Sequence, residues 1–133
     1  MLSLKIVPYV YLKETMSKGR GVFTSQDIPE GTTIEISSVL VLTPEERAHV
    51  EKTILYDYIF EWGDDGLECC VAWGYVSMYN HSFEANSEYE MDFEQRIITI
   101  RTREPIKAGS ELTINYNGDY DLSNPVWFDV EED

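Results

Sequence analysis

Basic residues are scarce in this sequence. The 133-residue chain holds 10 Lys and Arg against 25 Asp and Glu, for a net charge of −15. Proteins that bind nucleic acid need a surplus of basic residues, so we expect no direct nucleic-acid partner. The acidic charge is uneven: residues 1–27 are net +2, and the other 106 residues hold 23 acids and 6 bases, net −17. Such an acidic body attracts a cationic partner, although solubility alone is the simpler explanation.

Long hydrophobic runs are also missing. No segment approaches the roughly 20 apolar residues of a membrane-spanning helix, and we expect no membrane association. The apolar residues 6–12 form a short segment that contains Pro8 and lacks a cleavage site, so they predict a strand and not a signal peptide. An apolar fraction of 43% indicates a folded domain and argues against a disordered acidic tail.

Cysteine and histidine occur only twice each. Cys69 and Cys70 are adjacent, and adjacent residues form a disulfide only with strain. We therefore expect reduced thiols and an intracellular protein. His49 and His81 do not complete a zinc-binding spacing with these cysteines, so we expect no metal site.

Short runs of β-branched and aromatic residues predict an α+β domain that is mostly β. The expected strands are residues 5–12, 33–42, 68–73, 87–93, 97–102 and 112–116. Tyr89, Met91 and Phe93 would share one strand face, and residues 92–96 predict a hairpin connection. No linker or repeat divides the chain, so we expect a single domain over residues 1–133.

One helix has a strong start signal. Thr43, Pro44 and Glu46 supply an N-cap hydroxyl, a proline at the first helical position and the glutamate of a capping box. An apolar stripe follows at helical spacing and predicts packing against the core; it comprises Val50, Ile54, Leu55, Tyr58 and Ile59. Residues 63–66, Gly-Asp-Asp-Gly, are expected to end this helix.

Three segments carry candidate chemistry, and each is ambiguous by itself. Gly19 and Gly21 would let the backbone approach a ligand closely, but a tight turn is the simpler explanation. The polar pair Asn80-His81 follows an apolar stretch, so it either binds a ligand or ties strands together. The third segment, residues 111–116, is a strand that ends on Tyr116.

Together, in this order and spacing, the three segments resemble the SET domain of protein-lysine methyltransferases. Residues 19–23, Gly-Arg-Gly-Val-Phe, resemble its first motif; Asn80-His81-Ser82 with Asn86 resembles the second; and residues 111–116, Glu-Leu-Thr-Ile-Asn-Tyr, resemble the third. The resemblance covers a core of about residues 16–120 and is closest to minimal stand-alone SET proteins of bacteria and large viruses. It implies small β-sheets, one or two short helices and a C-terminal pseudoknot formed by the Asn-His segment and the last strand.

The resemblance also implies a site for S-adenosylmethionine and a substrate lysine. The cofactor-binding residues would be Lys18, Gly19, Arg20, Gly21, Asn80, His81, Tyr116 and Trp127. Tyr116 would orient the substrate amine by hydrogen bonding, and we do not assign it as a general base. Tyr58 and Tyr89 would complete a lysine channel with Tyr116, although core packing also explains both. The tail, residues 117–133, offers Tyr120, Trp127 and Phe128 for covering the cofactor or for an oligomer contact.

The sequence departs from the family pattern in four places. Many members follow the last strand with a zinc-binding cysteine cluster, which is absent from this sequence. Phe83, Ala85 and Asn115 stand where the family usually has Cys, Pro and an acidic residue. None of these changes removes a group that methyl transfer needs.

The implied function is methyl transfer from S-adenosylmethionine to a lysine of a basic protein. A histone or histone-like tail is the first candidate, and a bacterial DNA-packaging protein or a ribosomal protein would also fit. The alternative is a catalytically silent SET-fold module that binds basic peptides. Degenerate members usually lose the Tyr or the Asn-His pair, and both are present here. A monomer and a homodimer both remain open, and the expected location is the cytoplasm in a prokaryote or the nucleus for a eukaryotic or viral protein.

Overall fold

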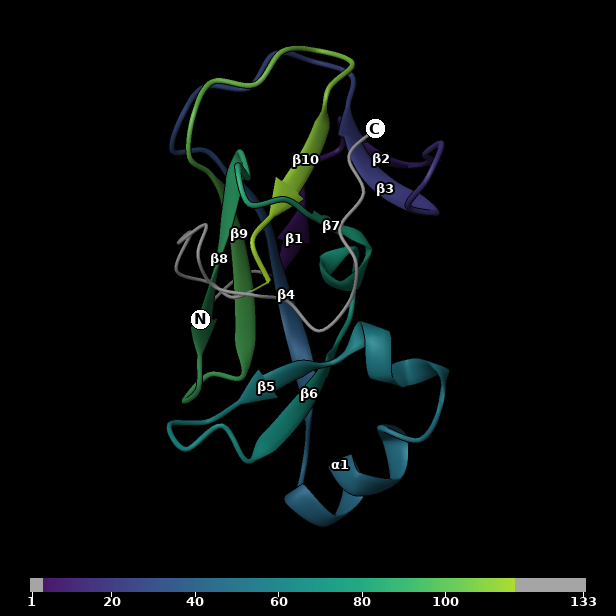
Figure 1. Ribbon diagram of the computed structural model, residues 1–133. Helices are drawn as coiled ribbons and strands as arrows, with labels where there is room; N and C mark the ends of the chain where they lie inside the picture. Colours follow the sequence, from purple (N-terminus) through teal and green to yellow (C-terminus); the bar gives the residue numbers. More distant parts are fainter. Residues whose placement is uncertain (1–3, 117–133) are drawn as a thin grey trace.

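The longest strand, β4 (Thr33–Leu42), organises the larger of two sheets in the computed structural model, which describes residues 4–116. The first part of β4 pairs antiparallel with β9 (Ile97–Thr102) on one side and β1 (Lys5–Ile6) on the other. Its last four residues pair with β6 (Glu68–Ala72). The strands β5 (Phe60–Trp62) and β8 (Ser87–Asp92) close the two ends of this sheet, and β8, β9 and β4 lie side by side in Figure 1.

The second sheet threads the last strand between two earlier segments. Its order is β2 (Val10–Glu14), β3 (Arg20–Thr24), β10 (Glu111–Ile114) and β7 (Asn80–His81). β10 runs antiparallel to β3 and parallel to β7. The last strand therefore lies beside the Asn-His segment, which is the crossing that the expected pseudoknot requires.

Alternating side chains from both sheets build the core. Ile98 and Ile100 of β9 are fully buried, and the intervening Thr99 is only partly buried, as a strand period of two requires. Ile34 from β4 and Leu112 from β10 join the same buried cluster. The two sheets thus share one hydrophobic core, and several candidate site residues, among them Asn80, His81 and Tyr89, lie on strands of these sheets.

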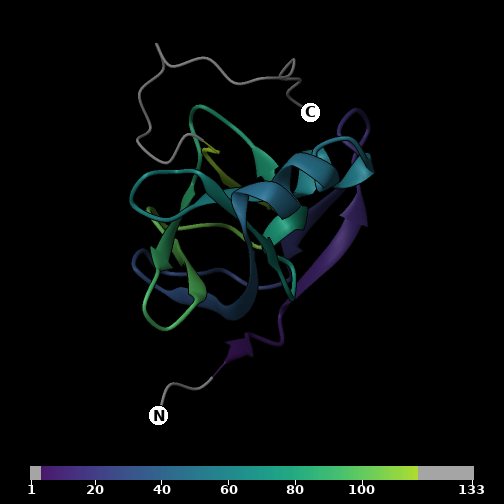
Figure 2. The same cartoon turned by 90° about the horizontal axis from the view of Figure 1, so that it is seen from below.

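The helical region differs from the expectation. α1 spans Pro44–Val50 and begins at the capping box of Thr43, as expected, but it ends after seven residues. A 3₁₀ helix, η1 (Ile54–Tyr58), follows it. No residue of α1 or η1, all of which are described, is buried, and Ile54 is 80% exposed. The expected core stripe is wrong, because a 3₁₀ helix has about 3.0 residues per turn and does not continue the α-helical spacing. Figure 2 views the molecule from the end at which α1 lies.

Three strands of the structure, β3, β5 and β7, are not predicted by the sequence patterns. Phe60–Trp62 forms β5, so residues 63–66 are the turn between β5 and β6 and do not end a helix. The glycine-rich segment continues from its turn into β3, and Asn80–His81 forms β7. The expected strand of residues 5–12 divides into β1 and β2 around Pro8, which cannot donate a backbone hydrogen bond.

Helix length, side-chain clusters and thiols complete the description of residues 4–116. Between residues 4 and 116, no helix combines the length and apolar character needed to cross a membrane. The same residues contain no group of three or more His, Cys, Asp and Glu side chains that could hold a metal ion. Cys69 and Cys70 are both free thiols and both buried.

Candidate active site

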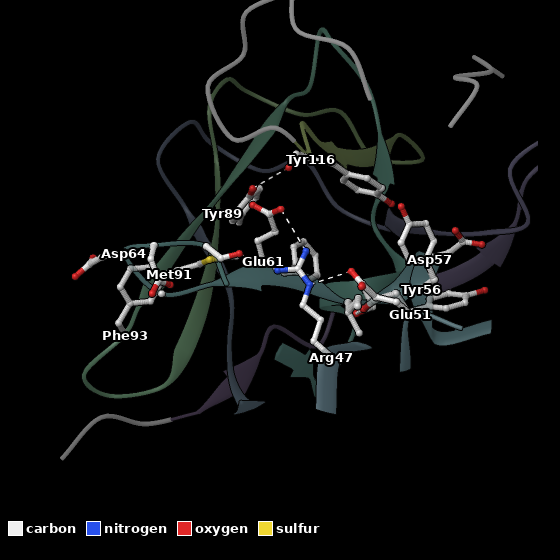
Figure 3. A pocket seen from close by; sticks show the side chains of 17 residues that line it. Arg47, Glu51, Tyr56, Asp57, Glu61, Asp64, Tyr89, Met91, Phe93 and Tyr116 are labelled. Carbon is white, nitrogen blue, oxygen red and sulfur yellow. Dashed lines mark hydrogen bonds and ion pairs between the residues drawn. The ribbon is translucent and has the colours of Figure 1, made fainter. Parts of the chain in front are cut away.

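A cavity of about 770 Å³ lies where α1, η1, the β5–β6 turn, β8 and the end of β10 meet (Figure 3). One group of lining side chains is aromatic or apolar, and it includes Tyr56, Tyr58, Phe60, Tyr89, Met91, Phe93 and Tyr116. A second group is acidic and consists of Glu51, Asp57, Glu61, Asp64 and Asp65. The cavity therefore combines apolar walls with negative charge.

Tyr116 is held in place by three kinds of contact. Its hydroxyl donates a hydrogen bond of 2.6 Å to the Tyr79 carbonyl oxygen, and its backbone N–H donates one of 3.0 Å to His81 Nδ1. Its ring meets the rings of His81 and Phe60 edge to face, with centroids 5.2 and 6.4 Å away. The phenol is thus fixed in position and direction.

The Tyr116 hydroxyl is also held in its neutral form. Burial, and then the negative charge of Glu111, raise the pKa of Tyr116 well above its ordinary value of 10.0. A phenol with a raised pKa stays protonated at physiological pH. It can donate and accept hydrogen bonds, but it is a poor proton acceptor for general-base catalysis.

Tyr89 and Tyr58 line the same cavity as Tyr116. The Tyr89 hydroxyl donates to the Tyr116 carbonyl oxygen at 3.0 Å, and Phe60 packs edge to face against the Tyr89 ring at 5.7 Å. Tyr89 also packs against the hydrophobic core. Tyr58 lies on η1 and is 40% exposed, so core packing does not account for it. The structure brings together all three tyrosines that the sequence analysis assigned to a channel.

A second cluster surrounds Gly21 on β3. The Asn80 side-chain amide donates to Glu111 Oε2 at 2.7 Å and to the Arg20 carbonyl oxygen at 3.2 Å. A Cβ added at Gly21 would collide with the Glu111 carboxylate and would lie 2.8 Å from Asn80 Nδ2. The missing side chain at Gly21 lets these two polar side chains approach the backbone of β3, and a larger residue would force them to move.

The turn before β3 lies outside the cavity lining. Lys18 N–H donates to Thr15 Oγ1 at 2.8 Å, and Thr15 N–H and Oγ1 both donate to the Gly19 carbonyl oxygen. Gly19 has a φ of 75°, in the left-handed region that favours glycine. The expected site therefore has two parts, this turn and the cavity, with Asn80 and His81 between them. Trp127, Tyr120 and Phe128 lie outside the described residues.

The motif formed by Asn80-His81-Ser82 and Asn86 joins separate segments of the chain in this structure. Asn86 accepts a hydrogen bond from Thr113 N–H at 3.0 Å and donates one to the Glu111 carbonyl oxygen at 2.9 Å. His81 packs edge to face against Phe83, with centroids 4.7 Å apart. The strand-tying alternative for Asn80 and His81 is thus correct as a description of their contacts, and it does not exclude ligand binding.

Sequence reasoning missed two residues that shape the site. Phe60 contacts both Tyr89 and Tyr116, but the sequence pattern predicts a helix that continues through residue 60 to the end signal at residues 63–66. Tyr79 supplies the carbonyl acceptor for Tyr116. No sequence signal identifies a backbone acceptor of this kind, because a carbonyl group is present at every residue.

Arg47 is the basic side chain among the described residues that line the cavity. Its guanidinium contacts Glu51 at 2.9 Å and Glu61 at 3.3 Å, as Figure 3 shows, and it donates to the carbonyl oxygens of Gly66 and Glu68. Its positive charge is compensated by these two carboxylates. The remaining acids leave the cavity net negative, which favours a cationic group.

Comparison with known proteins shows that the chain matches a family model and resembles a curated relative. The family model described as SET domain matches residues 19–117. A curated relative from Schizosaccharomyces pombe, named histone-lysine N-methyltransferase, H3 lysine-37 specific, is 38% identical over 123 residues. The match covers 90% of this chain and 77% of the relative.

Two solved structures share the fold. A crystal structure of a Plasmodium falciparum protein described as a histone methyltransferase has a TM-score of 0.66 and 24% identity, covering 84% of this chain and 95% of that chain. A humanized mutant of the Chaetomium thermophilum Polycomb Repressive Complex 2, bound to the inhibitor GSK126, has a TM-score of 0.67 and 22% identity. This second match covers 86% of this chain and 15% of the other.

Proposed function

The chain belongs to the SET-domain family, and we propose that it transfers methyl groups from S-adenosylmethionine to a lysine of a basic protein, a histone tail first among the candidates. The observation that carries this proposal is the position of the Tyr116 hydroxyl. This hydroxyl is neutral and is directed by the Tyr79 carbonyl, and it belongs to a side chain whose ring packs on His81 and which lines a cavity with aromatic walls. A histone substrate would imply the nucleus of a eukaryotic cell.

The chemistry of a lysine amine explains the composition of the cavity. The amine is nucleophilic only when neutral, yet its ordinary pKa is about 10.4. The acidic side chains of Asp57, Asp64 and Asp65, which are not paired with Arg47, would attract the ammonium form to the cavity. Beside Phe60 and Tyr89, the amine would lose water, and desolvation favours its neutral form.

Methyl transfer then requires alignment more than acid–base catalysis. The reacting atoms must approach to about 3–3.5 Å with the amine lone pair directed at the methyl carbon. The Tyr116 hydroxyl donates its proton to the Tyr79 carbonyl, so its oxygen can accept a hydrogen bond from an N–H of the amine. This bond would direct the amine lone pair toward the methyl carbon. Tyr89 and Phe60 restrict the movement of the Tyr116 ring, since both contact it or its backbone. We therefore assign Tyr116 to substrate orientation, with Tyr58 and Tyr89 as further walls of the lysine channel.

The residues of the second cluster suit the cofactor that SET methyltransferases generally use. S-adenosylmethionine carries a carboxylate, an ammonium group and a sulfonium, so its site needs donors, positive charge and acceptors. Lys18 and Arg20 flank the turn at Gly19 and would attract the carboxylate, and Asn80 and Glu111 offer acceptor oxygens to the ammonium group. When bound, the cofactor supplies the activated methyl group. Gly21 keeps this region open, and Trp127 stays a predicted contact.

The extent of the family match also bears on the domain organisation. The matched residues 19–117 include strands of both sheets, and these strands share one core. We propose that residues 1–133 form a single domain.

The decisive experiment is transfer of labelled methyl from S-adenosylmethionine to a panel of histones and bacterial basic proteins. Tyr116→Phe should lower kcat by about 100-fold, a loss typical of removing one oriented hydrogen bond at a reacting centre. Its affinity for the cofactor, measured by calorimetry, should stay unchanged. Tyr11→Phe is the matched control, because Tyr11 lies on β2 and stacks on Phe23 outside the cavity.

Each alternative has its own outcome. Equal transfer by Tyr116→Phe and the wild-type protein would contradict the role of Tyr116. A wild-type protein that labels nothing but binds cofactor would indicate that the panel lacks the substrate. A protein that binds basic peptides without binding cofactor would be the silent SET-fold module.

A further inference from the structure

Glu35 on β4 is a fully buried carboxyl group that the proposed reaction does not use. Its Oε2 accepts hydrogen bonds from Ser37 Oγ at 2.6 Å and from Tyr75 N–H at 2.8 Å. Its Oε1 accepts one of 3.0 Å from the Tyr79 hydroxyl. A carboxyl group is costly to bury unless hydrogen bonds satisfy it, so the groups that Glu35 binds indicate its role.

Two of these partners are the ends of one short segment. The 3₁₀ helix η2 (Val76–Met78) is preceded by Tyr75 and followed by Tyr79, and Glu35 binds both. Just before it, Gly74 has a φ of 71°, and a Cβ there would collide with the Glu35 carboxylate. The carboxyl group thus lies directly against the backbone of this segment and joins it to β4.

The other side of this segment faces the candidate active site. The Tyr79 carbonyl oxygen accepts the hydrogen bond of the Tyr116 hydroxyl at 2.6 Å. Ser77 Oγ donates to the Tyr58 carbonyl oxygen at 2.8 Å. The segment that Glu35 binds therefore contacts two residues that line the cavity, Tyr116 and Tyr58.

We propose that Glu35 is a positioning residue: by holding Tyr75 and Tyr79, it fixes η2 and thereby the carbonyl oxygen that directs the Tyr116 hydroxyl. Active sites reach their precision when a supporting layer of hydrogen bonds locks the residues that touch the substrate. A displacement of about 1 Å can cost about 100-fold in rate. The kinetic part of the inference rests on the proposed methyl transfer.

Tyr79→Phe tests this inference with little change in volume. It removes the hydroxyl that reaches Glu35 and leaves the backbone carbonyl in the chain. We expect kcat to fall about tenfold, because the carbonyl is less well placed, with KM for the substrate protein and affinity for the cofactor unchanged. Ser37→Ala is the matched control: it removes another donor to the same carboxylate without touching η2, and its kcat should stay within about twofold.

Combining variants separates positioning from general stability. Because Glu35 and Tyr79 act through the Tyr116 hydroxyl, Tyr79→Phe should cause little further loss when Tyr116 is already Phe. A merely structural role would make the two losses multiply. Multiplying losses, or an equal loss of kcat in Ser37→Ala, would overturn the proposal.

A spectroscopic measurement tests the same idea without any substrate. In protein with isotope-labelled tyrosine ζ carbons, the NMR signal of Tyr116 is identified by its absence from Tyr116→Phe. Its chemical shift reports the hydrogen bond of the hydroxyl, so we expect it to move in Tyr79→Phe and not in Ser37→Ala. An unmoved Tyr116 signal in Tyr79→Phe would overturn the proposal even if methyl transfer is observed, and a moved signal would support it even if no substrate is found.

Discussion

At the scale of single residues, we expect an added methyl group at Gly21 to affect both stability and cofactor binding. Its missing Cβ leaves room for the Glu111 carboxylate and the Asn80 amide. Gly21→Ala should lower the free energy of unfolding by about 1–3 kcal/mol, as overpacking of a well-packed site does. It should also weaken binding of S-adenosylmethionine, because Asn80 and Glu111 must move. Chemical denaturation and calorimetry measure the two effects.

Gly31→Ala is the control for this prediction. Gly31 has a φ of 78°, and a Cβ there would meet nothing within 4 Å. It should cost about 1–2 kcal/mol from backbone strain alone and leave cofactor affinity unchanged. Equal weakening of cofactor binding by both variants would show that close approach at Gly21 is irrelevant.

Glu35 gives a pH dependence whose sign follows from its burial. Desolvation raises the pKa of Glu35 above its ordinary value of 4.5, although hydrogen bonds from Ser37, Tyr75 and Tyr79 oppose the shift. Between 4.5 and the raised value, the folded protein binds more protons at Glu35 than the unfolded chain does. The stability that this group contributes is therefore present at low pH and is lost as pH rises through the folded pKa.

Comparison with Glu35→Gln isolates this contribution. The free energy of unfolding of the wild type minus that of the variant should decrease as pH rises from 4.5 through the raised pKa of Glu35. Denaturant titrations at a series of pH values measure the difference. A difference that increases with pH would mean that the three donors outweigh desolvation and hold the carboxylate ionised.

At the scale of elements, α1 depends on its neighbours for its place. It has seven residues, none of them buried, and so short a helix is unstable alone. Arg47 links it to the β5–β6 hairpin through the carbonyl oxygens of Gly66 and Glu68, at 2.8 and 3.1 Å. This one side chain joins α1, whose C-cap residue Glu51 lines the cavity, to the hairpin that carries Glu61, Asp64 and Asp65.

Arg47→Gln should therefore lower the free energy of unfolding by about 1.5–3 kcal/mol, the range for hydrogen bonds to a charged group. Arg101→Gln is the control, because Arg101 meets Glu90 only at 4.0 Å on an exposed sheet face. Its effect should stay within about 0.5 kcal/mol. Denaturant unfolding compares the two variants, and similar losses from both would contradict the linking role of Arg47.

The strands and helices also show where local sequence patterns are sufficient to predict the bounds of an element. β4 and β9 begin and end as expected, because both are runs rich in β-branched residues, and in β9 the buried Ile98 and Ile100 alternate with partly buried Thr99 and Arg101. The capping box places the start of α1 correctly. The predicted end of this helix is wrong. The apolar stripe at Ile54 and Leu55 follows helical spacing, but both side chains are exposed and α1 ends at Val50. β7 has two residues, too few for any periodicity, and pairing with β10 alone makes it a strand.

At the scale of the whole molecule, the net charge of −15 should govern encounter with a basic substrate. Raising NaCl from ~50 to ~500 mM shortens the Debye length to a few ångströms, so KM for a basic protein substrate should rise several-fold. Affinity for S-adenosylmethionine, a small zwitterion with one further positive charge, should change much less. Steady-state kinetics and calorimetry at matched salt concentrations check both, and a KM indifferent to salt would mean that the acidic surface serves solubility.

The sequence by itself determined the mostly β class, the strands with clear alternation and the SET-domain family, since periodicity and motif spacing are local properties of the chain. It also indicated that Tyr58, Tyr89 and Tyr116 belong together. Only the tertiary structure decided their partners: Tyr116 meets the Tyr79 carbonyl, 37 residues away, and Glu35 meets the Tyr79 hydroxyl, 44 residues away. Contacts across such separations depend on how β10 threads between β3 and β7, and the local pattern of side chains does not contain that path.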